Sequence, residues 1–191
     1  MCGAVIDGQL AMRPERGVAP TAPTAPASRA KTVRALYTPE QRKRRDATRW
    51  TLVQGVLAPI QFLVFAVSVV LVTRSLFTGQ GVMAAHVSII AKTFLLYTIM
   101  ITGAIWEKVV FGQYLFAEAF FWEDVVSFVV IALHTVYLGG LLTGRIPTTA
   151  LFVIALAAYA VYVVNAVQFI LKLRAARLQE ARETALRAAR A

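Results

Sequence analysis

The sequence predicts an all-α integral membrane protein: a four-helix bundle with both termini in the cytoplasm, a disordered N-terminal tail and a charged C-terminal helix. Of the 191 residues, 58% are hydrophobic and only 16% are charged, and this composition does not suit a soluble domain. Four apolar runs each contain the roughly 20 residues that a helix needs to cross a bilayer. Basic residues cluster before the first run and after the last, as expected for cytoplasmic ends.

The N-terminal tail, residues 1–36, carries the Pro- and Thr-rich stretch VAPTAPTAPAS instead of a continuous apolar signal peptide. We expect this tail to be disordered. From residue 37 onward we expect one membrane domain, residues 37–191. Thr38 as a cap and Pro39 at a first helical position predict a short interfacial helix leading into Trp50.

The four predicted spans are separated by short connections. The segment Gly144 to Pro147 is so short that the third and fourth spans should be antiparallel neighbours. The loop from Glu107 to Phe121 should be cytoplasmic, and the chain beyond Lys172 should form a charged helix outside the membrane. The spans cover approximately residues 50–76, 82–106, 122–142 and 148–171.

Polar residues fall on one face of each span at the helical spacing of about 100° per residue. We expect these faces to turn inward, because a membrane bundle buries its polar positions. Lys92 lies off its stripe, and we expect it to reach toward the non-cytoplasmic face. The four stripes are Gln54, Ala58, Gln61 and Ser68; His86, Thr93, Tyr97 and Lys108; Glu123, Ser127, His134 and Tyr137; and Asn165, Gln168 and Lys172.

The composition also excludes several classes of function. The net charge of +10 does not indicate a nucleic-acid partner, because neither basic cluster has interleaved aromatic residues. The clusters flank the spans, where basic residues anchor a protein to the bilayer. Cys2 is the only cysteine, so the chain can form neither an internal disulfide nor a cysteine-based metal site.

All acidic residues between Trp50 and Leu171 fall at one membrane face. Clustered carboxyl groups in a place of low dielectric can serve as general acid and base. The alternative is that they only end helices and lie in solvent, with two of them favouring a helix N-terminus. The candidate catalytic residues are Glu107, Glu118, Glu123 and Asp124.

Aromatic residues are dense around these carboxylates. They either form the usual interfacial belt or offer stacking surfaces to a flat apolar ligand that enters from the cytoplasmic leaflet. The candidate substrate-binding residues are Trp106, Tyr114 and Trp122, together with Tyr97 and His134 on the inward stripes. An imidazole inside a span must be neutral, hydrogen-bonded or coordinating, so His134 could bond a neighbouring helix, transfer a proton or ligate a metal carried by a ligand.

Three stretches closely resemble the 3-vinyl (bacterio)chlorophyllide hydratases of bacteriochlorophyll synthesis. They are YTPEQRKRRDATRWTLVQGVLAPIQFLVF, KTFLLYTIMITGAIWEKVVFGQYLFAEAFFWEDVVSF and ALHTVYL. The resemblance covers about Tyr37 to Lys172. It implies a hydro-lyase that adds water to the 3-vinyl group of a magnesium chlorin (chlorophyllide), forming a 3-(1-hydroxyethyl) group without any cofactor.

The resemblance also suggests roles for the candidate residues. Glu123 or Asp124 would donate the proton, and its neighbour or Glu107 would activate water, while His134 could be an axial ligand of the substrate magnesium; the protein itself would build no metal site. The resemblance implies a multi-pass protein of the bacterial inner, intracytoplasmic photosynthetic membrane, in contact with other bacteriochlorophyll-synthesis enzymes. The alternative function is a non-catalytic pigment- or haem-binding bundle, or a photosynthetic assembly subunit.

Overall fold

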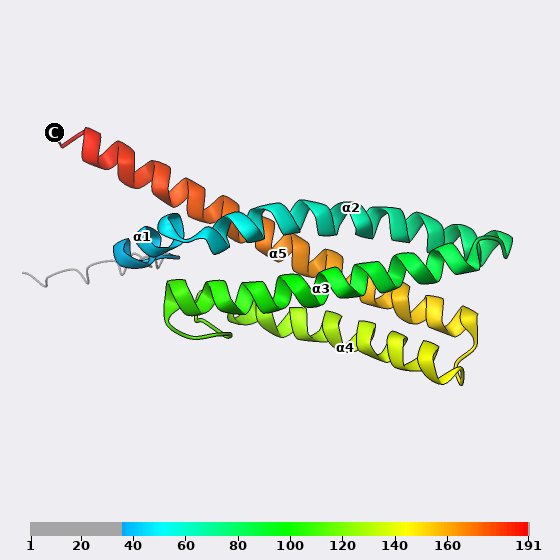
Figure 1. Cartoon of the computed structure of the whole chain (residues 1–191). Helices are drawn as coiled ribbons and strands as arrows, with labels where there is room; N and C mark the ends of the chain where they lie inside the picture. The colour runs from blue at the N-terminus through cyan, green and yellow to red at the C-terminus, as the bar shows by residue number, and fades with distance from the viewer. Residues whose placement is uncertain (1–35, 191) are drawn as a thin grey trace, which may run out of the picture. The chain divides into compact units, whose positions relative to one another are not determined.

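Five helices make up residues 36–190, the part of the chain that the computed structural model describes. A short helix α1 precedes four long helices, which pair as the hairpins α2–α3 and α4–α5 (Figure 1). Their bounds are α1 Pro39–Ala47, α2 Arg49–Thr78, α3 Val82–Phe111, α4 Phe121–Thr143 and α5 Thr148–Ala188. The described residues contain no strand, so the predicted all-α fold is confirmed.

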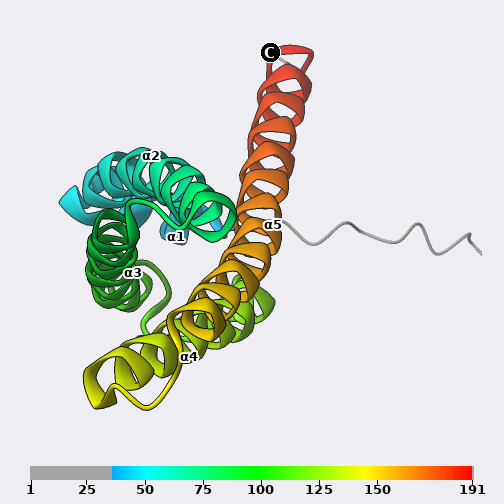
Figure 2. The same cartoon turned by 90° about the vertical axis from the view of Figure 1, so that its right-hand side faces the viewer.

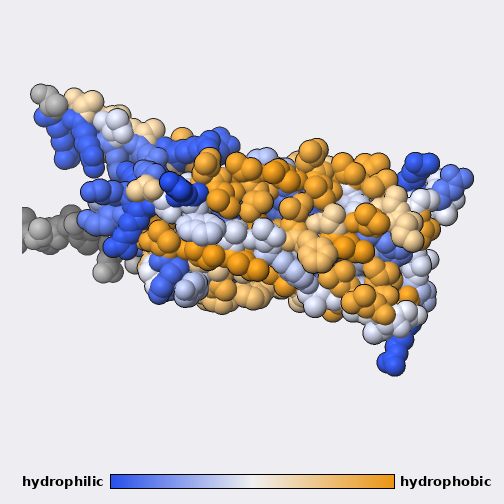
Figure 3. Space-filling view, in the orientation of Figure 1, coloured by the Kyte–Doolittle hydropathy of each residue, from blue (hydrophilic) through white to orange (hydrophobic). Residues whose placement is uncertain are grey.

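Helices α2 to α5 are each long and apolar enough to cross a membrane, and each contains one of the predicted spans. Apolar residues cover the middle of the helices, whereas hydrophilic residues gather at their ends (Figure 3). Viewed along the helices, the α2–α3 hairpin lies beside the α4–α5 hairpin (Figure 2). The protein is therefore a multi-pass membrane protein.

Helix α1 begins at the predicted residues. The Thr38 hydroxyl accepts a hydrogen bond from the Gln41 N–H at 3.2 Å, and the Gln41 side chain accepts one from the Thr38 N–H at 2.9 Å. This reciprocal capping box satisfies two N–H groups that have no partner within the helix. The predicted disordered tail, residues 1–36, lies outside the described residues except for Leu36.

Helix α5 continues for 41 residues without a break, so the charged C-terminal segment extends the fourth membrane helix. The extension holds α1 by ion pairs, with Arg42 3.1 Å from Glu183 and Arg45 2.9 Å from Glu180. The start of α2 and the end of α5 therefore lie at the same end of the bundle. The cytoplasmic location of that end remains a prediction.

The interior of the bundle contains polar residues among apolar ones, as the stripes predicted in part; Ala58 and Lys108 are exposed instead. The Ser68 hydroxyl of α2 bonds the Tyr159 hydroxyl of α5 at 2.6 Å, and Asn165 of α5 donates to the Ser127 hydroxyl of α4 at 2.7 Å. Such bonds join helices that lipid alone would not hold together. The buried stripe residues are Gln61, Ser68, Thr93, Glu123, Ser127, His134, Tyr137 and Asn165.

Lys92 was expected to reach out of the interior, and this expectation is wrong. Its side chain is 0% exposed, and its Nζ atom lies 3.5 Å from the centre of the Tyr162 ring. The buried face of α3 carries Ala85, Ile89 and Leu96 at helical spacing, and Lys92 falls on that face. The apolar period therefore decides which side of α3 turns inward, and Lys92 turns inward with it.

Among the glycines of the α4–α5 hairpin, Gly140 is the most tightly packed. A Cβ atom there would lie 2.6 Å from Ile146 Cδ1 and 2.9 Å from Leu151 Cδ2, whereas a Cβ atom on Gly139 would meet nothing within 4 Å. We predict that Gly140→Val costs about 1–3 kcal/mol more stability than Gly139→Val, because only the former overpacks the hairpin. Thermal unfolding in detergent measures the difference, and equal losses would contradict the prediction.

Candidate functional site

Three of the four predicted carboxylates converge where the loop of residues 112–120 joins α3 to α4. Glu107, Glu123 and Asp124 are 5%, 5% and 4% exposed. Glu107 stands near the C-terminal end of α3, whereas Glu123 and Asp124 occupy the first turn of α4. The site therefore forms between one helix end and the next helix start.

Glu107 and Asp124 are neighbouring carboxyl groups, because the N–H groups of the consecutive residues Phe116 and Ala117 each bind one of them. Two carboxyl groups can share a hydrogen bond only when one of them carries a proton, because ionised carboxylates are acceptors alone. The C-terminal end of a helix disfavours negative charge, and the N-terminal end favours it. The helix dipoles therefore favour the proton on Glu107 and the charge on Asp124.

The 112–120 loop closes over this pair and donates one backbone N–H group to each member. Phe116 N–H donates to Asp124 Oδ2 at 2.7 Å, and Ala117 N–H donates to Glu107 Oε2 at 3.2 Å. Phe116 has a φ angle of 59°, in the left-handed region that bulky residues rarely occupy. Because such strain costs on the order of 1–3 kcal/mol and clusters at functional sites, the loop conformation makes this place a candidate functional site.

Lys172 of α5 compensates the charge of Glu123, the third buried carboxylate. Its Nζ atom lies 2.5 Å from Glu123 Oε2 and also donates to the Ala119 carbonyl of the loop. Lys172 lies on the predicted inward stripe of the fourth span, but no sequence pattern pairs it with Glu123. The ion pair compensates the charge of Glu123 and holds its side chain in place. Glu107 and Asp124 are less constrained, because loop N–H groups bind them instead.

A buried aromatic cluster supports the site from behind. Trp106 Nε1 donates to the Thr51 hydroxyl at 2.9 Å, and the Trp106 ring meets Phe111 and Phe120 edge to face. Tyr37 packs on the same two phenylalanines, and burial raises the pKa of its hydroxyl to about 12. Trp106 is thus partly buried and held by Thr51 and the two phenylalanines. The proximity of Tyr37, which precedes α1, was not visible in the sequence.

A second group of aromatics lies on the outside of the same loop and helix. We call Phe116, Phe121, Trp122 and Phe128 the outer aromatic surface. Their side chains are between 40% and 67% exposed, and the Phe116 and Phe128 rings stack with centres 5.5 Å apart. Tyr114, 60% exposed, lies on the same loop with the Lys108 ammonium 5.2 Å from its ring centre. This surface touches the carboxyl site through the backbone of Phe116.

The remaining predicted site residues lie elsewhere. Glu118 is exposed and lines an open pocket of about 430 Å³ beside Phe111 and Gln113. Tyr97 bonds Thr135 at 2.7 Å across α3 and α4. His134 is 0% exposed deep in the bundle and lies 11 residues after Glu123, a rise of about 16 Å. The structure therefore does not bring these three residues to the Glu107–Asp124 pair.

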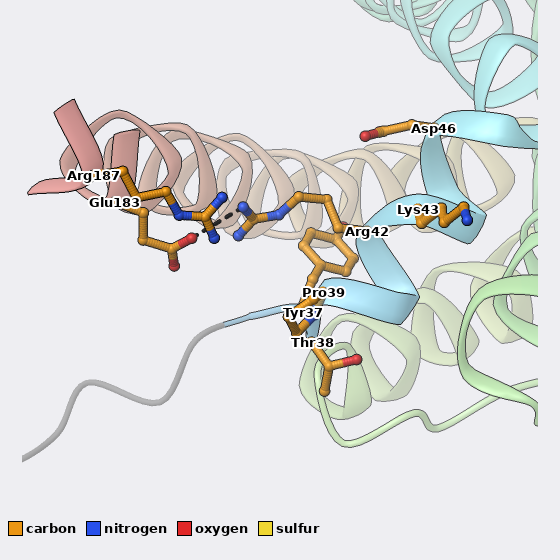
Figure 4. A pocket seen from close by; sticks show the side chains of 8 residues that line it. All are labelled: Tyr37, Thr38, Pro39, Arg42, Lys43, Asp46, Glu183 and Arg187. Carbon is orange, nitrogen blue, oxygen red and sulfur yellow. Dashed lines mark hydrogen bonds and ion pairs between the residues drawn. The ribbon is translucent and has the colours of Figure 1, made fainter. Parts of the chain in front are cut away.

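Another pocket, of about 620 Å³, opens between α1 and the extension of α5 (Figure 4). Arg42 and Glu183 bridge it, and Tyr37 forms part of its wall. It contains none of the predicted site residues. Within residues 36–190, no three His, Cys, Asp or Glu side chains gather as a metal site would require.

Comparison with known proteins gives a consistent set of relatives. Residues 37–175 match the family described as 2-vinyl bacteriochlorophyllide hydratase. A 2-vinyl bacteriochlorophyllide hydratase of Rhodobacter capsulatus is 70% identical over 152 residues, which cover 80% of this chain and 88% of the relative. A protein of the same name from Cereibacter sphaeroides is 72% identical over 145 residues, covering 76% and 90%. No solved structure matches the chain.

The Lys172–Glu123 ion pair gives a stability prediction. Lys172→Met leaves a buried carboxylate without its partner, and we expect a loss of about 3–5 kcal/mol, the usual cost of breaking a buried pair from one side. The double variant Lys172→Met/Glu123→Gln should recover most of that loss, because no unpaired charge remains. Thermal unfolding of the two single variants and the double variant measures the coupling. Additive losses would show that the pair is not coupled.

Proposed function

Since the chain belongs to the 2-vinyl bacteriochlorophyllide hydratase family, we propose that it adds water across the vinyl group of a bacteriochlorophyllide or chlorophyllide. The product carries a 1-hydroxyethyl group, and the protein is a hydro-lyase. The older ring numbering gives this vinyl group the number 2, and systematic numbering gives it the number 3. The observation that carries the proposed mechanism is the buried pair Glu107 and Asp124, which two consecutive N–H groups of the loop bind side by side.

The pair supplies the acid and the base that hydration needs. Glu107 donates its proton to the terminal vinyl carbon, which leaves a positive charge on the adjacent carbon, where the macrocycle delocalises it. Water attacks that carbon, and Asp124 removes the proton that the water loses. One proton and one hydroxyl are added, no electron is transferred, and no cofactor takes part. General acid–base catalysis of this type contributes about 10²- to 10⁴-fold to a rate.

In the proposal, a hydrogen bond between the two carboxyl groups also restores the starting state. After one turnover Glu107 is ionised and Asp124 carries a proton, so the pair still holds a single proton. Transfer along the hydrogen bond returns it to Glu107, near the C-terminal end of α3, where negative charge is disfavoured. The cycle therefore closes without a proton from outside the pair.

The substrate reaches the pair when the 112–120 loop moves. The carboxyl groups are 4–5% exposed, and the N–H groups of Phe116 and Ala117 occupy the side toward the loop. The strained backbone of Phe116 lowers the energy needed to leave this conformation. In the proposal the macrocycle lies on the outer aromatic surface with Tyr114 and Trp122 as stacking partners, and its vinyl edge enters beneath the displaced loop.

The proposal leaves Trp106, Tyr97 and His134 without direct contact to the vinyl group. Trp106 supports the site from the interior, and Tyr97 bonds α4. Ligation of the substrate magnesium by His134 would place the macrocycle deep in the bundle, away from both the carboxyl pair and the outer aromatic surface. Glu118 faces the open pocket and takes no part in the proposed proton transfers.

The location follows from the basic ends of the chain. We place the end of the bundle that bears the carboxyl site on the cytoplasmic side of the inner photosynthetic membrane of a bacterium, because Lys and Arg residues flank the spans there. A chlorin dissolved in the bilayer meets cytoplasmic water at that level. Other enzymes of bacteriochlorophyll synthesis would then receive the hydroxylated product at the same membrane face.

The reaction is tested by isotope incorporation. Purified protein mixed with a vinyl chlorophyllide in H₂¹⁸O should form the hydroxyethyl product with one heavy oxygen, detected by mass spectrometry. Glu107→Gln and Asp124→Asn should each lower kcat by about 10²-fold or more, since each removes one half of the acid–base pair. Glu118→Gln serves as the matched carboxylate from the adjacent loop and should retain turnover.

Each alternative predicts a different result from this experiment. Pigment that binds but stays unchanged would favour a pigment-binding bundle, and no interaction at all would favour an assembly subunit. Full turnover in both Glu107→Gln and Asp124→Asn, with hydration in the wild type, would refute the carboxyl pair while leaving the reaction intact.

The outer aromatic surface gives a kinetic prediction. Trp122→Ala removes one stacking partner worth about 0.5–1.5 kcal/mol, so KM for the vinyl chlorophyllide should rise about twofold to tenfold while kcat changes little. Phe77→Ala is the control. Phe77 is also apolar and 86% exposed, but it lies near the C-terminal end of α2, at the other end of the bundle from Trp122. A fall in kcat at constant KM would argue against a docking role for Trp122.

A further inference from the structure

Several buried polar atoms in the interior of the bundle have no hydrogen-bond partner. Each of the four spanning helices contributes at least one of them. An unpaired polar group in a membrane interior costs several kcal/mol, so these groups require an explanation. Within residues 36–190 the inward-facing ones are Gln61 Nε2 and, further along the helix, Ser75 Oγ on α2, Lys92 Nζ on α3, His134 Nε2 on α4, and Asn165 Oδ1 and Gln168 Oε1 on α5.

These atoms extend from the carboxyl site toward the middle of the membrane. Asn165 precedes Lys172 by 7 residues, which is about 10 Å along α5. Lys92 precedes Glu107 by 15 residues, about 22 Å along α3. Since His134 lies at an intermediate depth on α4, the unpaired atoms span a continuous range of depths.

The hydrogen bond that His134 makes through Nδ1 determines whether its other ring nitrogen, Nε2, must donate or accept. His134 Nδ1 lies 2.8 Å from the Val130 carbonyl oxygen, which can only accept, so Nδ1 carries the hydrogen. In a neutral ring Nε2 is then an acceptor. The Lys92 ammonium can only donate, and it is 0% exposed inside the bundle, as His134 is. A molecule between them must accept from Lys92 and donate to His134.

The other unpaired atoms also include both hydrogen-bond donors and acceptors. Gln61 Nε2 is a donor, whereas Asn165 Oδ1 and Gln168 Oε1 are acceptors. A small anion would satisfy only the donors, and a metal cation would satisfy only the acceptors. Water satisfies both, and buried water typically forms about three hydrogen bonds to polar groups of this kind.

We infer that the interior of the bundle binds water molecules, which link Asn165 and Gln168 near the carboxyl site to Gln61 and to the Lys92–His134 pair at mid-depth. This water solvates Lys92, whose other contact is the face of the Tyr162 ring. Tyr159 and Tyr162 flank the water, since the Tyr159 ring lies 5.8 Å from the His134 ring. The inference does not depend on the proposed hydration reaction.

Radiolytic labelling of the wild-type protein tests the inference. A short X-ray pulse converts bound water into hydroxyl radicals, which oxidise the side chains beside it, and H₂¹⁸O identifies the oxygen that they gain. In lipid nanodiscs, Tyr159, which is 2% exposed, should be labelled at a rate approaching that of exposed Tyr114. Phe152 is the control, because it is also 2% exposed but its ring partner is His86, which has no unpaired buried atom. Labelling of Tyr159 as slow as that of Phe152 would overturn the inference.

A double variant and an ion exchange complete the test. Lys92→Met/His134→Leu removes two of the groups that hold the water, and labelling of Tyr159 and Tyr162 should fall severalfold while that of Phe152 stays constant. Undiminished tyrosine labelling in this variant would separate the water from Lys92 and His134 and refute the assignment. Replacing chloride by gluconate should leave the thermal midpoint of the wild type unchanged; a chloride-dependent midpoint that Lys92→Met abolishes would assign the site to an anion instead.

Discussion

Lipid cannot form hydrogen bonds, and this constraint determines where every polar group of the four spanning helices goes. Apolar residues of α2 to α5 cover much of the outer surface (Figure 3), and several polar residues bond one another inside the bundle. Ser68 with Tyr159 and Asn165 with Ser127 illustrate the result, because each bond joins two different helices. The polar interior thus connects the α2–α3 hairpin to the α4–α5 hairpin.

The same constraint places the carboxyl groups where the helices end. Three buried carboxyls could not be tolerated in the hydrocarbon region, but at the α3–α4 connection they find partners: Lys172 for Glu123, and two loop N–H groups for Asp124 and Glu107. Hydrogen bonds to a charged group are worth about 1.5–3 kcal/mol each, comparable to the strain of a left-handed residue. The bond to Asp124 therefore offsets the unusual backbone of Phe116, and the loop can hold a strained conformation without being locked in it.

Periodicity and composition were sufficient for the fold, since each predicted span lies within one helix and the cap at Thr38 lies where the sequence indicates it. They were insufficient for Lys92, because its own polarity argued for the outside while the apolar spacing of its helix turned it inward. The site was predictable only as a region. The partnership of Glu123 with Lys172 joins residues 49 positions apart, and no local pattern reveals such a contact. Phe116 could not be recognised either, because a left-handed phenylalanine has no sequence signal.

In the proposed mechanism, the positions of Glu107 and Asp124 on opposite helix termini give two similar carboxyl groups different roles. If both stood at helix N-termini, both would favour the ionised form, and neither would keep a proton for the vinyl group. If both stood at C-termini, neither would remain a base. The connection from α3 to α4 places one carboxyl group at each kind of terminus, a few ångströms apart, so the chain reversal creates the chemical asymmetry. An acid and a base can therefore arise from the fold at this point without any metal ion or second protein.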